Sequence, residues 1–216
     1  MPGSERSVHW DRVFSSKDAD EVTWYQPRLE VSLALIDGAG LPLSAPIIDV
    51  GAGASTLVDD LLDRGYSDIT VLDISATALE ISKQRLGARA EQVTWIVGDL
   101  TTIDLPPARY QLWHDRAVFH FMTDDASRAA YVRTASRALG DGGYLVVATF
   151  AENGPTRCSG LDAARYSAEA LSRELGQGFE SMMSKEEVHT PPAGGEQSVL
   201  YCKLRKVSVP KTLSSP

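Results

Sequence analysis

The sequence predicts an α/β fold with a doubly wound, mostly parallel sheet of seven strands and helices on both sides. Short apolar runs that lack a polar face alternate with helical segments through the middle of the chain, as parallel strands alternate with crossover helices. The first run leads into the glycine-rich loop Gly51-Ala52-Gly53. Two longer strand-like segments joined by a Pro/Gly-rich loop end this pattern, which indicates a C-terminal antiparallel hairpin.

The expected strands cover residues 47–50, 69–72, 93–97, 110–113 and 143–148, followed by the hairpin strands 179–189 and 197–206. The expected helices are 56–64, 76–86, 124–139 and 167–175, in which apolar residues recur three or four positions apart. Residues 8–37 fit one or two helices with a polar break at 15–20, so we expect 1–45 to form an N-terminal helical lid. Residues 1–206 would then form one domain and residues 207–216 a polar tail.

Composition and charge argue against several classes of protein. No stretch of the 216 residues approaches the roughly 18 uninterrupted apolar residues of a membrane span, and no secretory signal is visible, so a cytoplasmic protein is expected. Cys158 and Cys202 have no His or Cys nearby at metal-ligand spacing, which predicts free thiols and no metal site. A net charge of −8 without a basic cluster makes a nucleic-acid partner unexpected. The oligomeric state is not indicated.

A cofactor site is predicted at the ends of the first three strands. Gly51 and Gly53 lack a Cβ, so a ligand can approach backbone N–H groups at the start of the next helix. Asp73 ends the second strand about 20 residues beyond Gly53, the place of an acid that accepts hydrogen bonds from a ribose diol. A nicotinamide-binding protein shares these two features. Thr56, however, replaces the third glycine of that fingerprint, and the third strand ends in Gly98-Asp99.

A family resemblance extends this site. Residues 47–57, Asp73, Gly98-Asp99 and the segment Leu139-Gly140-Asp141-Gly142-Gly143 resemble, in this order, the motifs of class I S-adenosylmethionine-dependent methyltransferases. The resemblance covers roughly residues 46–148 and implies a Rossmann-like sheet with S-adenosyl-L-methionine as cofactor. It places Gly51, Ala52 and Gly53 beside the methionine part, Asp73 on the ribose, and Asp99 with Leu100 near the adenine. Further candidates for cofactor binding are Asp49, Thr56, Ile74 and Asp115.

Residues 113–121 follow the fourth expected strand and should face the transferred methyl group, because ligands gather outside the carboxyl ends of such strands. Asp115 and Arg116 resemble the Asp-Arg pair of thiopurine- and thiol-type methyltransferases. The segment is also similar to that of the group that includes the citrate synthase lysine methyltransferase, in which sequences resembling Trp24-Tyr25 and Arg157-Cys158-Ser159-Gly160-Leu161 also occur. Asp115 would hold the methionine amino group or orient a substrate amine. An internal ion pair with Arg116 is the alternative.

His120 is the candidate general base, because an imidazole titrates near neutrality. Helical spacing would place it one turn beyond Arg116, where a structural hydrogen bond is the alternative role. Asp115, Arg116 and His120 are thus the catalytic candidates. On the substrate side, Trp24 and Tyr25 would form a lid or serve as packing anchors. Loops 150–166 and 189–197 should open above the cofactor, which adds Arg157, Arg165, Tyr166 and His189, although loop arginines are often simply solvated.

The predicted activity is metal-free transfer of a methyl group by in-line displacement. The acceptor would be N, S or O of a small molecule or of a protein side chain. A non-catalytic protein that binds S-adenosylmethionine stays open, as does a nicotinamide-dependent oxidoreductase, which explains neither Gly98-Asp99 nor the hairpin. The acceptor itself is not predicted, because its pocket is assembled from distant loops.

Overall fold

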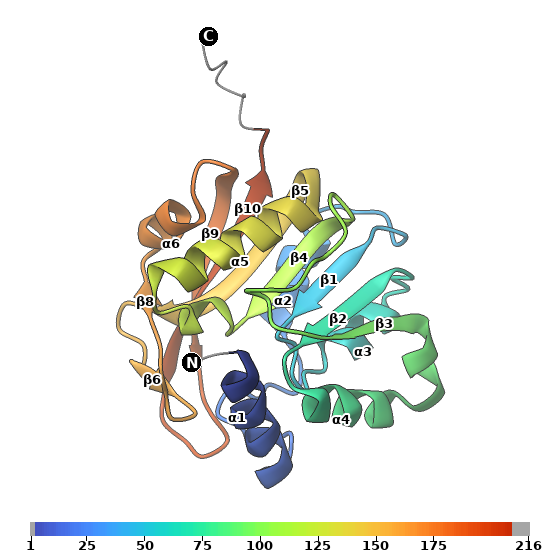
Figure 1. The fold of residues 1–216 in the computed structure, drawn as a ribbon, viewed down its shortest axis with the longest axis vertical. Coiled ribbons are helices and arrows are strands. Elements are labelled where there is room, and N and C mark those ends of the chain that lie inside the picture. The colour runs from blue at the N-terminus through green and yellow to red at the C-terminus, as the bar shows by residue number, and fades with distance from the viewer. Residues whose placement is uncertain (1–2, 209–216) are drawn as a thin grey trace.

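The sheet follows the strand order β3-β2-β1-β4-β5-β10-β9 in the computed structural model, which describes residues 3–208 (Figure 1). A two-residue strand, β8, pairs with β5 and makes it an eight-stranded sheet. The strand bounds are β1 (Ile47–Val50), β2 (Ile69–Asp73), β3 (Val93–Val97), β4 (Tyr110–Arg116), β5 (Leu139–Ala151), β8 (Arg165–Tyr166), β9 (Phe179–His189) and β10 (Gln197–Lys206).

Strands β1 to β5 run parallel, and β10 lies antiparallel between β5 and β9. This confirms the predicted fold class, a mostly parallel sheet closed by a C-terminal hairpin. The chain order reverses at β1, which pairs with β2 on one side and β4 on the other. In parallel sheets such a reversal leaves a crevice beyond the carboxyl ends of the strands, where ligands bind.

Helices cover both faces of the sheet (Figure 1). On one face, α2 (Glu30–Asp37), α3 (Leu57–Asp63) and α4 (Ala76–Leu86) pack apolar side chains against β1, β2 and β3. On the other face, α5 (Asp125–Ala138) and α6 (Ala168–Leu175) pack against β4, β5 and β10. A short helix, η1 (Gly87–Gln92), leads from α4 into β3. The strands without a polar face predicted a sheet that is apolar on both faces, and helices bury both of these faces.

Helix α1 (Gly3–Ser16) belongs to neither layer and lies at the carboxyl edge of the sheet (Figure 1). Asp11 fastens it to the start of α4, because its Oδ1 accepts hydrogen bonds from Ser75 Oγ at 2.7 Å and from Thr77 N at 3.2 Å. The expected helical region 8–37 is thus two helices, α1 and α2, separated by turns over 17–29.

Several details differ from the prediction, beginning with β5, which spans Leu139–Ala151 where 143–148 was expected, and with the additional strand β8. Strand β4 continues to Arg116 instead of ending at 113, so His120 lies not in a helix that contains Arg116 but in the short helix η2 (Phe119–Phe121). The loop after β5 contains an unpredicted hairpin, β6 (Arg157–Cys158) and β7 (Leu161–Asp162). At the expected tail, Val207 still donates a hydrogen bond to Gly178 O at 2.9 Å, and residues 209–216 lie outside the described residues. No helix within residues 3–208 has the length and apolar character to cross a membrane.

Candidate active site

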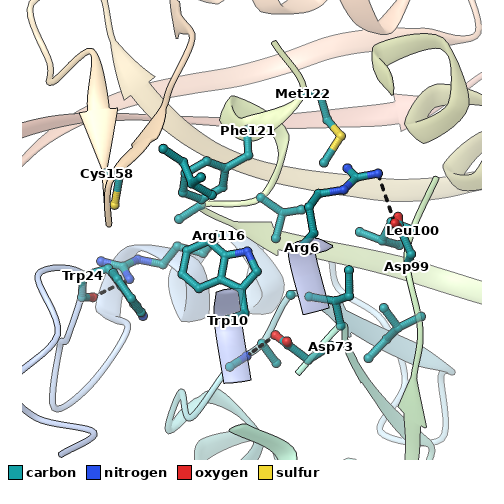
Figure 2. A pocket seen from close by; sticks show the side chains of 18 of the residues that line it. Arg6, Trp10, Trp24, Asp73, Asp99, Leu100, Arg116, Phe121, Met122 and Cys158 are labelled. Carbon is teal, nitrogen blue, oxygen red and sulfur yellow. Dashed lines mark hydrogen bonds and ion pairs between the residues drawn. The ribbon is translucent and has the colours of Figure 1, made fainter. Parts of the chain in front are cut away.

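A cavity of about 340 Å³ lies beyond the carboxyl ends of β1, β2, β3 and β4 (Figure 2). Strand ends and the loops that follow them form one side, which we call the cofactor side. Helix α1, the linker after it, η2 and the β6–β7 hairpin form the other, the acceptor side. Most of the predicted cofactor residues line the cavity: Asp49, Gly51, Ala52, Gly53, Asp73, Ile74, Asp99 and Leu100.

The glycine loop needs glycine at both positions. Gly51 has a φ of +59° and Gly53 a φ of +56°, values that other residues adopt only with strain. A Cβ on Gly51 would also lie 1.9 Å from Cγ2 of Val118, and one on Gly53 would lie 2.8 Å from Cζ of Phe14. The loop backbone is therefore packed closely between the β4–η2 segment and α1.

Asp73 ties this loop to the end of β2. Its Oδ2 accepts a hydrogen bond from Gly53 N and its Oδ1 one from Ser75 N, both at 2.7 Å. The side chain is buried, and this desolvation raises the pKa of Asp73 to about 6 despite the two N–H donors. Each oxygen retains one lone pair, so the carboxylate can still accept hydrogen bonds from a diol.

Asp99 connects the end of β3 to α1. Oδ1 accepts hydrogen bonds from the backbone N and the hydroxyl of Thr101, at 2.8 and 2.7 Å. Oδ2 lies 3.0 Å from Nη2 of Arg6, an ion pair visible in Figure 2. Helix α1 is therefore held across the cavity at two points, by Arg6 here and by Asp11 at Ser75.

Asp115 and Arg116 point to opposite faces of β4, as consecutive strand residues do, so the alternative of an internal ion pair between them is wrong. Asp115 is fully buried away from the cavity wall and accepts hydrogen bonds from Val118 N, Phe119 N and Tyr131 Oη. Burial raises its pKa to about 6. It shapes the turn after β4.

Arg116 lines the cavity and bonds only neutral groups among the residues 5–208. Nη1 donates to Trp24 O at 2.7 Å and Nε donates to Tyr201 Oη at 3.1 Å. The guanidinium thereby fixes the linker that carries Trp24, and no carboxylate of the described side chains pairs with it. A positive charge without a counter-ion therefore stands at the acceptor side.

Four aromatic residues lie on that side. Trp10 lies edge-on to Trp24 and Phe121, with ring centroids 5.8 and 5.2 Å apart, and Phe14 lies 6.0 Å from Trp24. We call these four residues the aromatic wall; Figure 2 shows Trp10, Trp24 and Phe121 around the cavity. Cys158, Leu161 and Asp162 of the β6–β7 hairpin continue it. Trp24 thus lies where the sequence predicted.

His120 is enclosed beside this wall and does not line the cavity. Its ring stacks on Phe150 with centroids 4.5 Å apart, and neither nitrogen has a hydrogen-bond partner within the described chain. Burial, and to a lesser degree the charge of Arg116, lowers the pKa of His120 to about 3. The imidazole is therefore neutral at pH 7.

The other predicted residues lie off the main cavity wall. Thr56 precedes α3 and donates to Pro27 O, while Tyr25 borders a second, small cavity. His189 bonds Thr23 O at 2.8 Å and so braces the linker. Arg157, Arg165 and Tyr166 also lie away from the wall. Arg157 pairs with Asp162, and Tyr166 packs on Phe119.

Sequence reasoning missed Arg6, Trp10 and Phe14 of α1, whereas it included His114, Val118 and Phe121 only as members of the segment 113–121. Trp10 and Phe14 are four positions apart in α1, a spacing that places them on one helix face and would have allowed their prediction as a pair. Within residues 5–208, no cluster of three or more His, Cys, Asp or Glu side chains could hold a metal ion.

The cofactor side fits S-adenosylmethionine. The cradle at Gly51 and Gly53 lines the cavity with backbone, so the amino-acid end can approach it closely, Asp73 can accept from a ribose diol, and Asp99 lies at the next strand end.

Known proteins resemble this chain over the same region. Residues 47–143 match the family described as methyltransferase domain. The eEF1A lysine and N-terminal methyltransferase of Mus musculus is 26% identical over 138 residues, which are 64% of this chain and only 19% of that protein. EEF1A lysine methyltransferase 2 of Homo sapiens is 23% identical over 197 residues, covering 85% of this chain and 76% of the human protein.

A solved structure shows the same fold. The 1,6-didemethyltoxoflavin-N1-methyltransferase of Burkholderia thailandensis, solved with S-adenosylhomocysteine bound, matches with a TM-score of 0.68 at 20% sequence identity. The match covers 95% of this chain and 87% of the Burkholderia chain. The matched region carries the glycine cradle, Asp73 and Asp99 on one cavity wall. In its matched sequence, its fold and its cofactor side, the chain therefore resembles the class I S-adenosylmethionine-dependent methyltransferases, whose cofactor is S-adenosylmethionine.

Proposed function

We propose that the protein transfers a methyl group from S-adenosylmethionine to an amine nitrogen, and that this amine is a lysine side chain of a protein. One observation carries the proposal: the cofactor side and the aromatic wall line the same cavity, so donor and acceptor would meet in one largely apolar chamber. The relatives named as lysine methyltransferases support nitrogen as the acceptor atom.

Bound S-adenosylmethionine supplies an electrophilic methyl carbon on a sulfonium ion. The protein has to align the acceptor with that carbon and exclude water. The glycine cradle and Asp73 orient the donor, while Trp24, held by Arg116, closes the acceptor side. The nitrogen lone pair then bonds to the methyl carbon as the carbon–sulfur bond breaks, the bonding pair stays on sulfur, and the proton leaves the nitrogen for water.

An amine must be neutral to react, and the acceptor side favours the neutral form. Burial against the aromatic wall lowers the pKa of an ammonium group, and so does the unpaired positive charge of Arg116. His120, with its pKa of about 3, is a poor proton acceptor in this environment. The acceptor amine therefore loses its proton to water because its pKa is lowered, and no side chain has to act as general base.

A small-molecule amine is the second candidate acceptor, and the position of α1 favours it. Arg6 and Asp11 hold that helix across the cavity, and a lysine of another protein needs an open path past it. The structural neighbour from Burkholderia thailandensis is by its name an N-methyltransferase of a small ring compound.

Transfer of labelled methyl groups separates the candidates. The purified protein is incubated with methyl-tritiated S-adenosylmethionine and extract from its own host, and macromolecules are then separated from small molecules. We expect label in protein, released on hydrolysis as N-methylated lysine, and little label with Asp73→Asn. Label confined to small molecules supports the second candidate. Intact cofactor binding with no labelled product contradicts both and indicates a binding protein.

A further inference from the structure

Behind the cofactor side, three polar side chains form a buried triad: Asp49 of β1, His114 of β4 and Ser32 of α2. Asp49 and His114 are directly paired in the register of the two strands. Nδ1 of His114 lies 2.7 Å from Asp49 Oδ1, and its Nε2 lies 2.9 Å from Ser32 Oγ. The residues are 2%, 1% and 0% exposed, in a region where unpartnered polar groups are costly.

The hydrogen-bond directions follow from the chemistry of the groups. An ionised carboxylate only accepts, so Nδ1 of His114 carries the hydrogen and donates to Asp49. In the neutral imidazole Nε2 is then an acceptor, and the Ser32 hydroxyl donates to it. This arrangement fixes both the tautomer and the plane of the imidazole.

The triad is not a hydrolytic site despite its residue types. Ser32 Oγ is enclosed between α2 and the sheet, and Ser32 does not line the cavity, so no substrate can reach it as a nucleophile. Asp49 and His114, in contrast, both line the cavity beside Gly51. The triad therefore reaches the cavity through Asp49 and His114 and not through Ser32.

We infer that His114 is a positioning residue for the cofactor, which holds the Asp49 carboxylate at the ammonium group of the amino-acid end. His114 bonds Oδ1 of Asp49, and Asp49 lines the cavity, which leaves Oδ2 for a cationic donor of a bound ligand. Ser32 supports the imidazole from behind and thereby links α2 to the site. The inference rests on the proposed function through its cofactor alone, so it can be tested without knowing the acceptor.

Two ligands isolate the effect. S-Adenosylhomocysteine carries the amino-acid end, whereas 5′-methylthioadenosine shares the nucleoside and thioether but lacks that end. Calorimetry should show that His114→Ala lowers the affinity for S-adenosylhomocysteine by about tenfold, the size expected for a charge-assisted contact. The affinity for 5′-methylthioadenosine should change by less than about twofold. His114→Asn keeps a donor near Asp49 and should restore most of the lost affinity.

The Asp49→Asn/His114→Ala double variant should bind no more weakly than Asp49→Asn alone, because the two residues act through one contact. Ser32→Ala, which removes one hydroxyl, is the substitute if His114→Ala fails to fold, and it should show the same ligand selectivity with a smaller loss. Equal losses for both ligands, or no loss, overturn the inference while the proposed function stands. If the wild-type protein binds neither ligand, the proposed function fails as well.

Discussion

Most of the cofactor side of the cavity comes from one stretch of chain, residues 49–100, with His114 of β4 beside it, whereas the acceptor side is assembled from segments between residues 6 and 162. The first is made of backbone and carboxylates whose positions the parallel strands fix. The second is made of aromatic rings joined by edge contacts, with Arg116 as the main polar tie. The difference indicates that cofactor binding depends on local geometry and acceptor choice on packing between distant segments.

The largest effect is expected in the glycine cradle. Gly51→Ala combines a positive φ with a Cβ at 1.9 Å from Val118, so cofactor affinity should fall by about 100-fold or more. Gly87→Ala is the matched control, because Gly87 has a φ of +58° with no atom within 4 Å and lies away from the cavity. It should cost about 1 kcal/mol of stability without changing affinity. Calorimetry and thermal unfolding measure both, and an unchanged affinity in Gly51→Ala contradicts the cradle.

Cofactor affinity should also depend on pH through Asp73. Its carboxylate accepts hydrogen bonds best when ionised, and burial raises its pKa to about 6. We therefore expect affinity for S-adenosylhomocysteine to rise about tenfold from pH 5 to pH 7 and then level off. Asp73→Asn should bind more weakly with little pH dependence. A profile that is flat in the wild-type protein contradicts this role.

The same groups predict the opposite trend for stability. The pKa values of Asp73 and Asp115 are raised from 3.8 to about 6, so the folded protein binds more protons than the unfolded chain between these values. Their contribution to the free energy of unfolding is present below pH 3.8 and is lost as the pH rises through about 6. Ligand-free protein should show this decline in denaturant titrations, less steeply in Asp73→Asn.

A smaller effect is expected where α1 joins the two sides. Arg6→Ala breaks the ion pair with Asp99, which should loosen α1 and speed cofactor association by about threefold, since partly exposed ion pairs contribute little. Arg12→Ala removes the same charge from the same helix at an exposed position and should leave the rate unchanged. Stopped-flow fluorescence of the cavity tryptophans would measure the rate of cofactor association. Equal rates in all three proteins would show that α1 does not gate the site.

The smallest effect concerns His120 on the acceptor side. His120→Phe removes two buried nitrogens without partners, so stability should stay equal or rise by about 1 kcal/mol. His120→Asn keeps a polar group there and should destabilise. Methyl transfer by His120→Phe should remain within about threefold of wild type, because no base is required. A folded variant that binds cofactor but transfers no methyl group would instead establish His120 as the base.

Sequence patterns located the cofactor side because its chemistry is local. The glycine loop, Asp73 and Asp99 each follow an apolar strand directly, and the expected bounds of α4, β9 and β10 agree with the structure. Strand β4 was expected to end at 113, since His114 and Asp115 are polar. Their partners, Ser32 of α2 and Tyr131 of α5, are 82 and 16 positions away in the sequence, so their burial was not visible in a local pattern.

The acceptor side depends on tertiary contacts that no local pattern encodes. Trp10 and Phe121 are separated by more than half of the chain, yet their rings lie 5.2 Å apart. Arg157 was expected on the substrate side, but the sharp turn at Ser159 and Gly160 gives its neighbours Cys158 and Leu161 the inward positions instead. Loop residues alternate sides according to turns that sequence alone left open.

A crystal structure with bound S-adenosylhomocysteine would show directly which wall of the cavity holds each end of the cofactor. We expect the ribose hydroxyls at Asp73, the amino-acid end between Gly51 and Asp49, and the thioether sulfur directed towards the aromatic wall. A ligand outside this cavity, or one whose sulfur points away from Trp10 and Trp24, would contradict the division into a cofactor side and an acceptor side.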